Sequence, residues 1–105
     1  MKNKVVACIP SKDSAWILKR TIPHLSKFCH KIIISDDGST DETYEVCSQH
    51  SSVEYFKRPD RDHADRQGGL QRQEILERAY KHDPDYFFFL DADEMPSPDI
   101  IDWID

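Results

Sequence analysis

The 105-residue sequence lacks the features that would place it in a membrane or on nucleic acid. It has no apolar run near the roughly 18 residues that a spanning helix requires, and its start, MKNKVVACIP, shows no long apolar core or cleavage-like site of a signal peptide. Basic residues are outnumbered, because 14 Lys and Arg stand against 20 Asp and Glu, for a net charge of −6. We therefore expect a cytoplasmic protein with no transmembrane segment and no nucleic-acid partner, while peripheral membrane association through further regions stays open.

Cysteine is scarce and histidine is scattered. Cys8, Cys29 and Cys47 are odd in number and lie inside apolar segments, so they indicate neither a disulfide framework nor a paired-cysteine metal site. We interpret all three as small core residues. The five histidines show no zinc-ligand spacing with each other or with cysteine. These absences leave carboxylates as the candidate metal ligands.

What the sequence does contain is typical of one small globular domain, residues 1–105, with 38% hydrophobic and 32% charged residues. Apolar runs predict strands at 5–9, 31–35, 53–56 and 86–90, and helical spacing predicts helices at 15–28, 40–50 and 70–81, with a last helix after Ser97. Pro10 is expected to end the first strand, and Pro23 to kink or restart the first helix. This alternation predicts an α/β fold, a Rossmann-like parallel sheet with helices on both faces.

The order of the strands follows from the handedness of their connections. Right-handed crossovers place the first three strands successively in one direction and return the fourth to the other side of the first. Ligands of such sheets bind outside the carboxyl ends of the strands, where the winding reverses. We therefore expect loops 10–13, 36–41 and 91–96 to meet at one crevice.

Two of these loops are acidic, DDGSTD at 36–41 and DADE at 91–94. Like charges at one rim raise each other's pKa or recruit cations, and carboxylates without nearby histidine or cysteine suit Mg²⁺ or Mn²⁺. Asp93, or Asp91 together with Asp93, is predicted to hold a metal that bridges a nucleotide diphosphate. The basic stretch at 57–72 has two interpretations, contact with such a diphosphate or a solvated loop.

Other features have structural explanations. The spacing of Ser39 and Glu42 predicts a capping box at a helix start, which does not explain the need for both Asp36 and Asp37. The apolar run at 86–90 is predicted to be core, and its strand to be an apolar edge that needs a neighbour. Trp16 and Trp103 are predicted to be packing residues.

Four segments carry a resemblance to a known family: VVACIPSKD, IIISDDGSTDET, GGLQRQEI and YFFFLDADEMPSPD. In this order and spacing the sequence closely resembles the nucleotide-sugar-binding half of glycosyltransferase family 2, inverting enzymes of GT-A fold. The resemblance implies the N-terminal half of a larger domain. It also implies a metal-dependent module that binds a UDP- or GDP-sugar, with inverting transfer to the hydroxyl of a glycan, lipid-linked or protein acceptor.

The resemblance also implies roles for individual residues. The nucleotide-binding set would be Pro10, Ser11, Asp13, Asp36, Asp37, Gly69, Arg72 and Asp91. The metal, Mn²⁺ or Mg²⁺, would lie on Asp93 and Asp91. For Arg72 a surface ion pair with Glu74 or Glu77 is an equal alternative to contact with the base or the phosphates.

The catalytic base is not assigned, and the resemblance places it beyond residue 105. Donor binding without turnover by this chain is therefore expected. Two other functions stay open: a non-catalytic nucleotide-binding module, and another Mg²⁺-dependent phosphoryl enzyme on a doubly wound sheet. The sugar, the base and the acceptor are not determined by the sequence.

Overall fold

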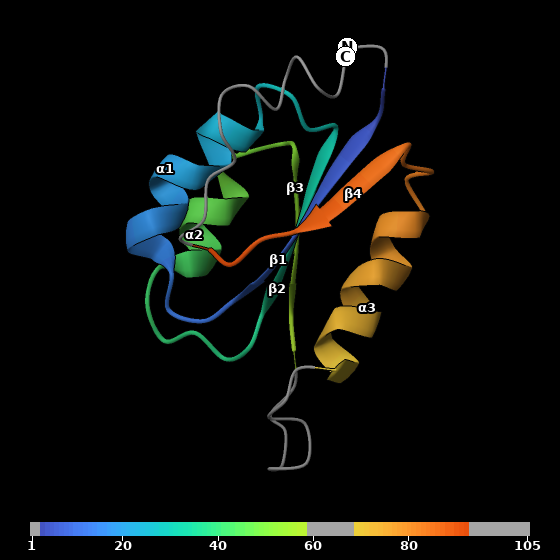
Figure 1. Ribbon diagram of the computed structural model, residues 1–105. Helices are drawn as coiled ribbons and strands as arrows, with labels where there is room; N and C mark the ends of the chain where they lie inside the picture. The colour runs from blue at the N-terminus through green and yellow to red at the C-terminus, as the bar shows by residue number, and fades with distance from the viewer. Residues whose placement is uncertain (1–2, 59–68, 93–105) are drawn as a thin grey trace.

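Strands and helices alternate along residues 3–58 and 69–92, the part of the chain that the computed structural model describes (Figure 1). In chain order the elements are β1 (Val5–Ser11), α1 (Ala15–Leu25), β2 (Lys31–Asp36), α2 (Thr43–Ser48), β3 (Val53–Lys57), α3 (Gly69–Tyr80) and β4 (Tyr86–Phe89). All neighbouring strands pair in parallel, in the order β3-β2-β1-β4. The predicted fold class and strand order are confirmed.

The sheet separates two layers of core, because successive side chains of a strand point to opposite faces. Along β1, Val5, Ala7 and Ile9 pack in the cluster formed with α1 and α2, while Val6 and Cys8 pack with α3. Figure 1 shows α1 and α2 on one side of the sheet and α3 on the other. Every position from Val5 to Ile9 is fully buried, which explains why an unbroken apolar run forms a central strand.

Pro10 does not end the first strand, contrary to the sequence prediction. β1 continues to Ser11, and Pro10 is in register with Ser35 of β2. The Cys8 carbonyl accepts a hydrogen bond from the Leu90 amide (3.0 Å), on the β4 side, and pairing with β4 ends at Cys8. The Pro10 nitrogen faces the same side beyond that end, so its missing N–H costs no ladder bond. β1 therefore reaches past β4 and delivers Ser11 to the rim of the sheet.

The helices also differ in detail from the prediction. α1 does not restart at Pro23, which lies inside the helix two residues before its end at Leu25. α2 begins at Thr43 rather than at residue 40, and its N-cap residue, Glu42, makes no side-chain cap bond. The predicted capping box is therefore wrong, because the Ser39 hydroxyl accepts a hydrogen bond from the loop that follows β1.

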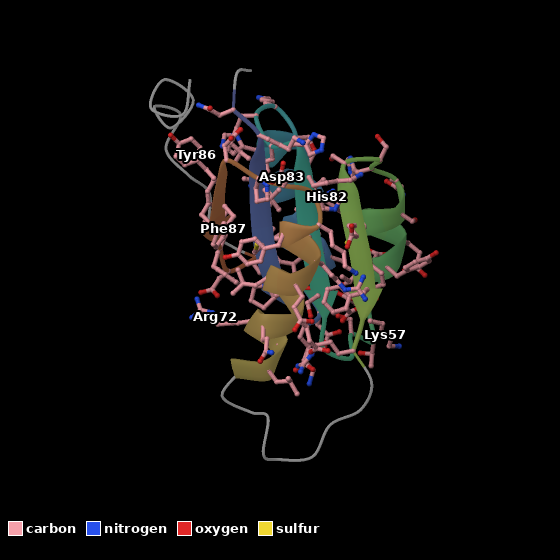
Figure 2. All side chains as sticks on the ribbon, turned by 90° about the vertical axis from the view of Figure 1, so that its right-hand side faces the viewer. Lys57, Arg72, His82, Asp83, Tyr86 and Phe87 are labelled. Atoms are coloured by element: carbon pink, nitrogen blue, oxygen red, sulfur yellow. The ribbon has the colours of Figure 1, made fainter. Side chains whose placement is uncertain are left out.

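β4 forms one edge of the described sheet, and its exposure is mixed. Tyr86 is 41% exposed and Phe87 is 40% exposed, while Phe88 and Phe89 are partly buried against the two core clusters. The predicted apolar edge is confirmed, but the run is not uniformly core. Phe87 of this edge strand lies on the α3 side of the sheet (Figure 2). The Tyr80 ring meets the Phe87 ring edge-on, with the ring centres 5.6 Å apart.

The structure bears on the predictions made for the cysteines and for membrane-spanning helices. Cys8, Cys29 and Cys47 are all buried and unpaired, and burial raises the pKa of each thiol to about 12. Within residues 3–58 and 69–92, no helix combines the length and hydrophobicity needed to cross a membrane. The predicted last helix and Trp103 lie outside the described residues.

Candidate functional site

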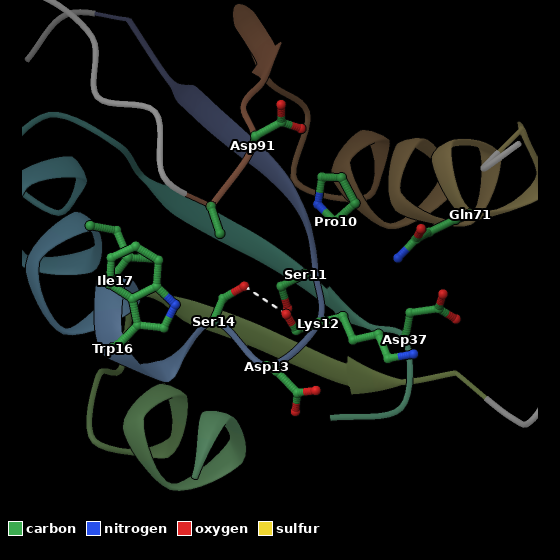
Figure 3. Close-up of a pocket in the computed structure, with 11 residues that line it drawn as sticks. Pro10, Ser11, Lys12, Asp13, Ser14, Trp16, Ile17, Asp37, Gln71 and Asp91 are labelled. Atoms are coloured by element: carbon green, nitrogen blue, oxygen red, sulfur yellow. Dashed lines mark hydrogen bonds between the residues drawn. The ribbon is translucent and has the colours of Figure 1, made fainter. Parts of the chain in front are cut away.

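A cleft of about 490 Å³ lies at the carboxyl ends of the strands, where the sequence predicts it. Figure 3 shows Asp13, Asp37 and Asp91, from three separate loops, around it. The exit of β4 is fixed to α1, because the Thr21 hydroxyl donates a hydrogen bond to the Ala92 carbonyl (3.0 Å). The cleft is lined by Pro10, Ser11, Lys12, Asp13, Ser14, Trp16, Ile17, Asp37, Gln71, Asp91 and Ala92.

Asp36 lies beneath the cleft and does not line it. Only 2% of the residue is exposed. Its Oδ1 accepts a hydrogen bond from the Ser39 amide (2.8 Å), and its Oδ2 accepts one from the Tyr55 hydroxyl. Burial, together with that bond to Asp36, raises the pKa of Tyr55 above its ordinary value. Both oxygens of Asp36 are therefore used to hold the loop onto the sheet.

Asp37, the next residue, faces the cleft. Its amide donates to the Ser11 carbonyl (2.9 Å), which fixes its backbone against β1. Its Oδ1 accepts a hydrogen bond from the Arg58 guanidinium (3.1 Å), while 46% of the side chain is exposed. Gly38 follows with φ +91°, a conformation that glycine adopts without a steric penalty and that turns the loop at this point. Asp37 thus presents a carboxylate oxygen to the cleft.

Asp13 connects the loops that follow β1 and β2. Its φ is +50°, which Asp tolerates better than most residues, and its amide donates to the Ser39 hydroxyl (2.8 Å). Its Oδ1 accepts from the amides of Thr40 (2.7 Å) and Asp41 (3.3 Å). Asp13 therefore lines the cleft, but its carboxylate is engaged in joining the two loops.

Asp41 joins the starts of two helices. Its Oδ1 accepts from the Thr43 amide (3.0 Å) at the start of α2, and its Oδ2 accepts from the Ala15 amide (3.1 Å) at the start of α1. The Thr43 hydroxyl, which also donates to Oδ1, lowers the pKa of Asp41. Asp41, rather than Ser39, therefore supplies the side-chain oxygens that accept hydrogen bonds from amides at the helix starts.

The floor of the cleft contains a polar contact that the sequence analysis missed. The Gln71 side-chain amide donates to the Ser35 hydroxyl (3.1 Å) and carbonyl (3.4 Å), and the Ser11 hydroxyl donates to the same carbonyl (3.4 Å). All three residues are buried. A buried polar side chain in the first turn of a helix is a signal that could have identified Gln71, since α3 packs on β1 and β2.

Arg58 lies in the basic stretch at 57–72, for which the sequence analysis named a diphosphate contact or a solvated loop but no role for Arg58 itself. It follows β3 by one position, its amide donates to the Asp36 carbonyl (2.8 Å), and its side chain is 1% exposed. The guanidinium contacts Asp37 and, through Nε, Glu74 of α3 (2.9 Å). The rule that ligands gather at strand carboxyl ends applies to β3 as well, and it points to this position.

Two cleft residues depart from their predicted roles. Trp16 is 71% exposed and lines the cleft, so its interpretation as a packing residue is wrong. The helical pattern of α1 places it on the face away from Leu18 and Ile22. Lys12, which had no predicted role, is a cation at the same cleft.

The structure separates Arg72 from the cleft. Its guanidinium lies over the ring of Phe89, 4.6 Å from the ring centre, on the α3 side of the sheet (Figure 2). Within the described residues, no ion pair joins Arg72 to Glu74 or Glu77. Its contact with the base or the phosphates stays a prediction. Gly69 is the first residue of α3, and its contact with a donor stays a prediction.

The described acids fit a metal only in part. Among residues 3–58 and 69–92, no three His, Cys, Asp or Glu side chains form a group that could hold a metal ion. Asp91 lines the cleft, and Asp93 lies outside the described residues. Mg²⁺ sites in proteins often use one or two carboxylates together with substrate phosphates, so Asp91 is compatible with such a site.

Several solved structures are similar to this chain. Two structures of glucosyl-3-phosphoglycerate synthase from Mycobacterium tuberculosis match with 20% identity and a TM-score of 0.62. One is in complex with UDP, the other with Mn²⁺, UDP and glucosyl-3-phosphoglycerate. Each match covers 97% of this chain and 38% of the synthase, so the chain spans well under half of that protein. A mycobacterial protein also matches, with 19% identity, a TM-score of 0.55 and coverage of 97% and 35%.

A search of curated proteins gave no match. The model of the family described as Glycosyl transferase family 2 matches residues 6–102, nearly the whole chain. The structural neighbours have the GT-A fold. The chain belongs to glycosyltransferase family 2.

Proposed function

We propose that the cleft at the carboxyl ends of the strands binds a nucleotide-diphosphate sugar, with UDP as the nucleotide. The observation that carries the proposal is Asp37, a carboxylate held on one oxygen by Arg58 and exposed to the cleft. Support for UDP comes from the structural neighbours that were solved with it. We place the residues in one donor-binding domain, the N-terminal part of a larger GT-A domain.

In this proposal Asp37 accepts a hydrogen bond from the N–H of the base or from a ribose hydroxyl, since an ionised carboxylate is an acceptor only. Pro10 and Ser11 lie beside the base, and Gln71 closes the floor beneath it. Asp36 contributes indirectly by fixing the loop that carries Asp37. The two neighbouring acids, predicted as a pair of nucleotide contacts, therefore have separate roles.

We further propose that Asp91 and Asp93 hold Mn²⁺ or Mg²⁺. When bound, such a metal neutralises negative charge on the departing diphosphate. The positively charged side chain of Lys12 lines the cleft, and it would add to the attraction for the phosphates.

For the complete enzyme we propose inverting transfer of the sugar to an acceptor hydroxyl of a glycan, lipid-linked saccharide or protein. The acceptor oxygen forms a bond to the anomeric carbon, the bond from that carbon to the diphosphate breaks, and the acceptor proton passes to a general base. We assign that base to none of the described residues. Membership of family 2 favours this function over the phosphoryl-transfer alternative.

The test is thermal unfolding of the chain with UDP, GDP, dTDP and CMP, each with Mn²⁺ and each with EDTA. A ligand at a hundred times its Kd adds about 2.7 kcal/mol to the free energy of unfolding. We expect a raised Tm with UDP and Mn²⁺, a smaller rise in EDTA, and a much smaller rise in Asp37→Asn. A folded chain whose Tm responds to no nucleotide contradicts the proposal, and a response equal in all four contradicts the choice of UDP.

A further inference from the structure

Arg58, which follows β3, is a buried arginine that contacts two acids. Its side chain is 1% exposed, and its guanidinium lies 3.1 Å from Oδ1 of Asp37 and 2.9 Å from Oε1 of Glu74. Its own amide bonds to the Asp36 carbonyl at 2.8 Å. β2 and α3 thus hold Arg58 through contacts other than the one with Asp37.

The two acids that Arg58 contacts differ in their relation to the cleft. Glu74 lies in α3 and does not line the cleft, whereas Asp37 does. Within the described residues, the hydrogen bonds of the Asp37 carboxylate use Oδ1 and leave Oδ2 for a ligand. A guanidinium is a rigid fork of donors, so a carboxylate bonded to it loses rotational freedom.

We propose that Arg58 is a positioning residue for nucleotide recognition, acting through Asp37. It holds the Asp37 carboxylate in one orientation before the nucleotide arrives, so that the ordering cost is met during folding rather than during binding. This inference rests on the proposed function, because it assumes that Asp37 contacts the nucleotide.

A purely structural role for Arg58 predicts a different result, and a double-mutant cycle distinguishes the two. We would measure the Kd for UDP with Mn²⁺ by calorimetry in the wild-type chain, Arg58→Lys, Asp37→Asn and the double variant. Lysine keeps the charge but lacks the planar fork. We expect Arg58→Lys to raise the Kd about tenfold in the presence of Asp37, and less than about twofold in the Asp37→Asn background. An equal effect in both backgrounds overturns the proposal.

Glu74→Gln is the matched control, because it alters the other carboxylate that Arg58 contacts. It is expected to reduce stability while leaving the Kd for UDP within about twofold of wild type. A loss of affinity equal to that of Arg58→Lys would show that Arg58 acts through the packing of α3, and would overturn the proposal.

A second measurement covers the case in which Arg58→Lys does not fold. Side-chain ¹⁵N NMR of the wild-type chain follows the Arg58 Nε and Nη signals during addition of UDP with Mn²⁺. We expect these signals to shift in the wild type and to stay unchanged in Asp37→Asn. Signals that do not move in a wild-type chain that binds UDP refute the positioning role alone, whereas a wild-type chain that binds no UDP refutes the proposed function and this inference with it.

Discussion

In the described part of the chain, two clefts of similar size lie at opposite ends of the strands. The cleft at the carboxyl ends, about 490 Å³, is lined by Asp13, Asp37 and Asp91 together with Lys12. The cleft at the amino ends, about 450 Å³, is lined by Asn3, Lys4, Ser26, Lys27, Phe28, Cys29, His30 and Asp85. Positive charge alone would select the second cleft for an anionic nucleotide, because Lys4 and Lys27 line it, whereas fold topology selects the first.

The difference lies in what the side chains at each end are used for. At the amino end the chain is held largely by its backbone, as in the bond from the His30 amide to the Val5 carbonyl (2.7 Å). Its carboxylate, Asp85, bonds the Lys4 amide (2.7 Å). At the carboxyl end, Asp13 accepts hydrogen bonds from the loop that carries Asp41, and Asp41 accepts one from the start of α1. The side chain of Asp37 faces the cleft. A binding site arises where the loops are satisfied and one oriented polar group remains.

The largest expected effect on this comparison comes from Asp37→Asn. The substitution keeps the shape but replaces an acceptor-only carboxylate, so we expect a loss of about 2 kcal/mol in UDP binding, roughly a thirtyfold rise in Kd. Calorimetry with Mn²⁺ measures it. A Kd within about twofold of wild type would remove the main distinction between the two clefts.

Tyr55→Phe tests whether Asp36 supports the fold rather than the ligand. The buried Oδ2 of Asp36 loses its partner, and we expect the free energy of unfolding to fall by about 1–2 kcal/mol in urea titrations. UDP affinity of the folded variant should change little. A variant with full stability and lost affinity would reverse the roles assigned to Asp36 and Asp37.

The same contact predicts a response to alkaline pH. The pKa of Tyr55 is raised in the folded chain, so its contribution to stability is complete below the ordinary value of 10.0 and is lost as pH rises through the raised value. Wild-type stability should therefore decline more steeply than that of Tyr55→Phe above that pH. Parallel declines in urea titrations would contradict the assigned bond.

Asp41→Ala is expected to have a smaller effect. It removes the acceptor for amides at the starts of α1 and α2, which should cost about 1 kcal/mol of stability. Because the pKa of Asp41 is lowered on folding, its contribution is complete above the ordinary value of 3.8 and is lost as pH falls through the lowered value. Urea titrations at neutral and acidic pH should show the difference between variant and wild type shrinking in acid. A constant difference speaks against the bonds.

Lys27→Met should have the smallest effect and sharpens the comparison from the other side. Lys27 lines the amino-end cleft and is exposed, so we expect stability within about 0.5 kcal/mol and UDP affinity within about twofold of wild type. A large loss of UDP affinity in this variant would move the site to the amino end.

The fold was largely predictable, because its signals are local. Apolar runs such as residues 31–35 identify buried strands, and crossover handedness then determines the strand order. The errors occur where a distant partner decides the outcome. Pro10 continues a strand because β4 stops before reaching it, and Ser39 fails to cap α2 because it bonds to the Asp13 amide instead.

The candidate site was predictable in position but not in the roles of its residues. Pro10, Ser11, Asp13, Asp37 and Asp91 do line the cleft, as the motifs indicate. The division between Asp36 and Asp37 depends on Tyr55 and Arg58, which lie far away in the sequence. No local pattern contains that information.

The sequence by itself therefore indicated the family, through the resemblance of its motifs. It also determined the parallel sheet and the end of that sheet where a ligand would bind, because hydrophobic periodicity and chain handedness act over short ranges. Only the tertiary structure decided which acid faces the cleft and which lies beneath it with both carboxylate oxygens hydrogen-bonded. Hydrogen bonds act within about 3 Å, and the partners that assign each carboxylate come together only when β2, β3 and α3 pack.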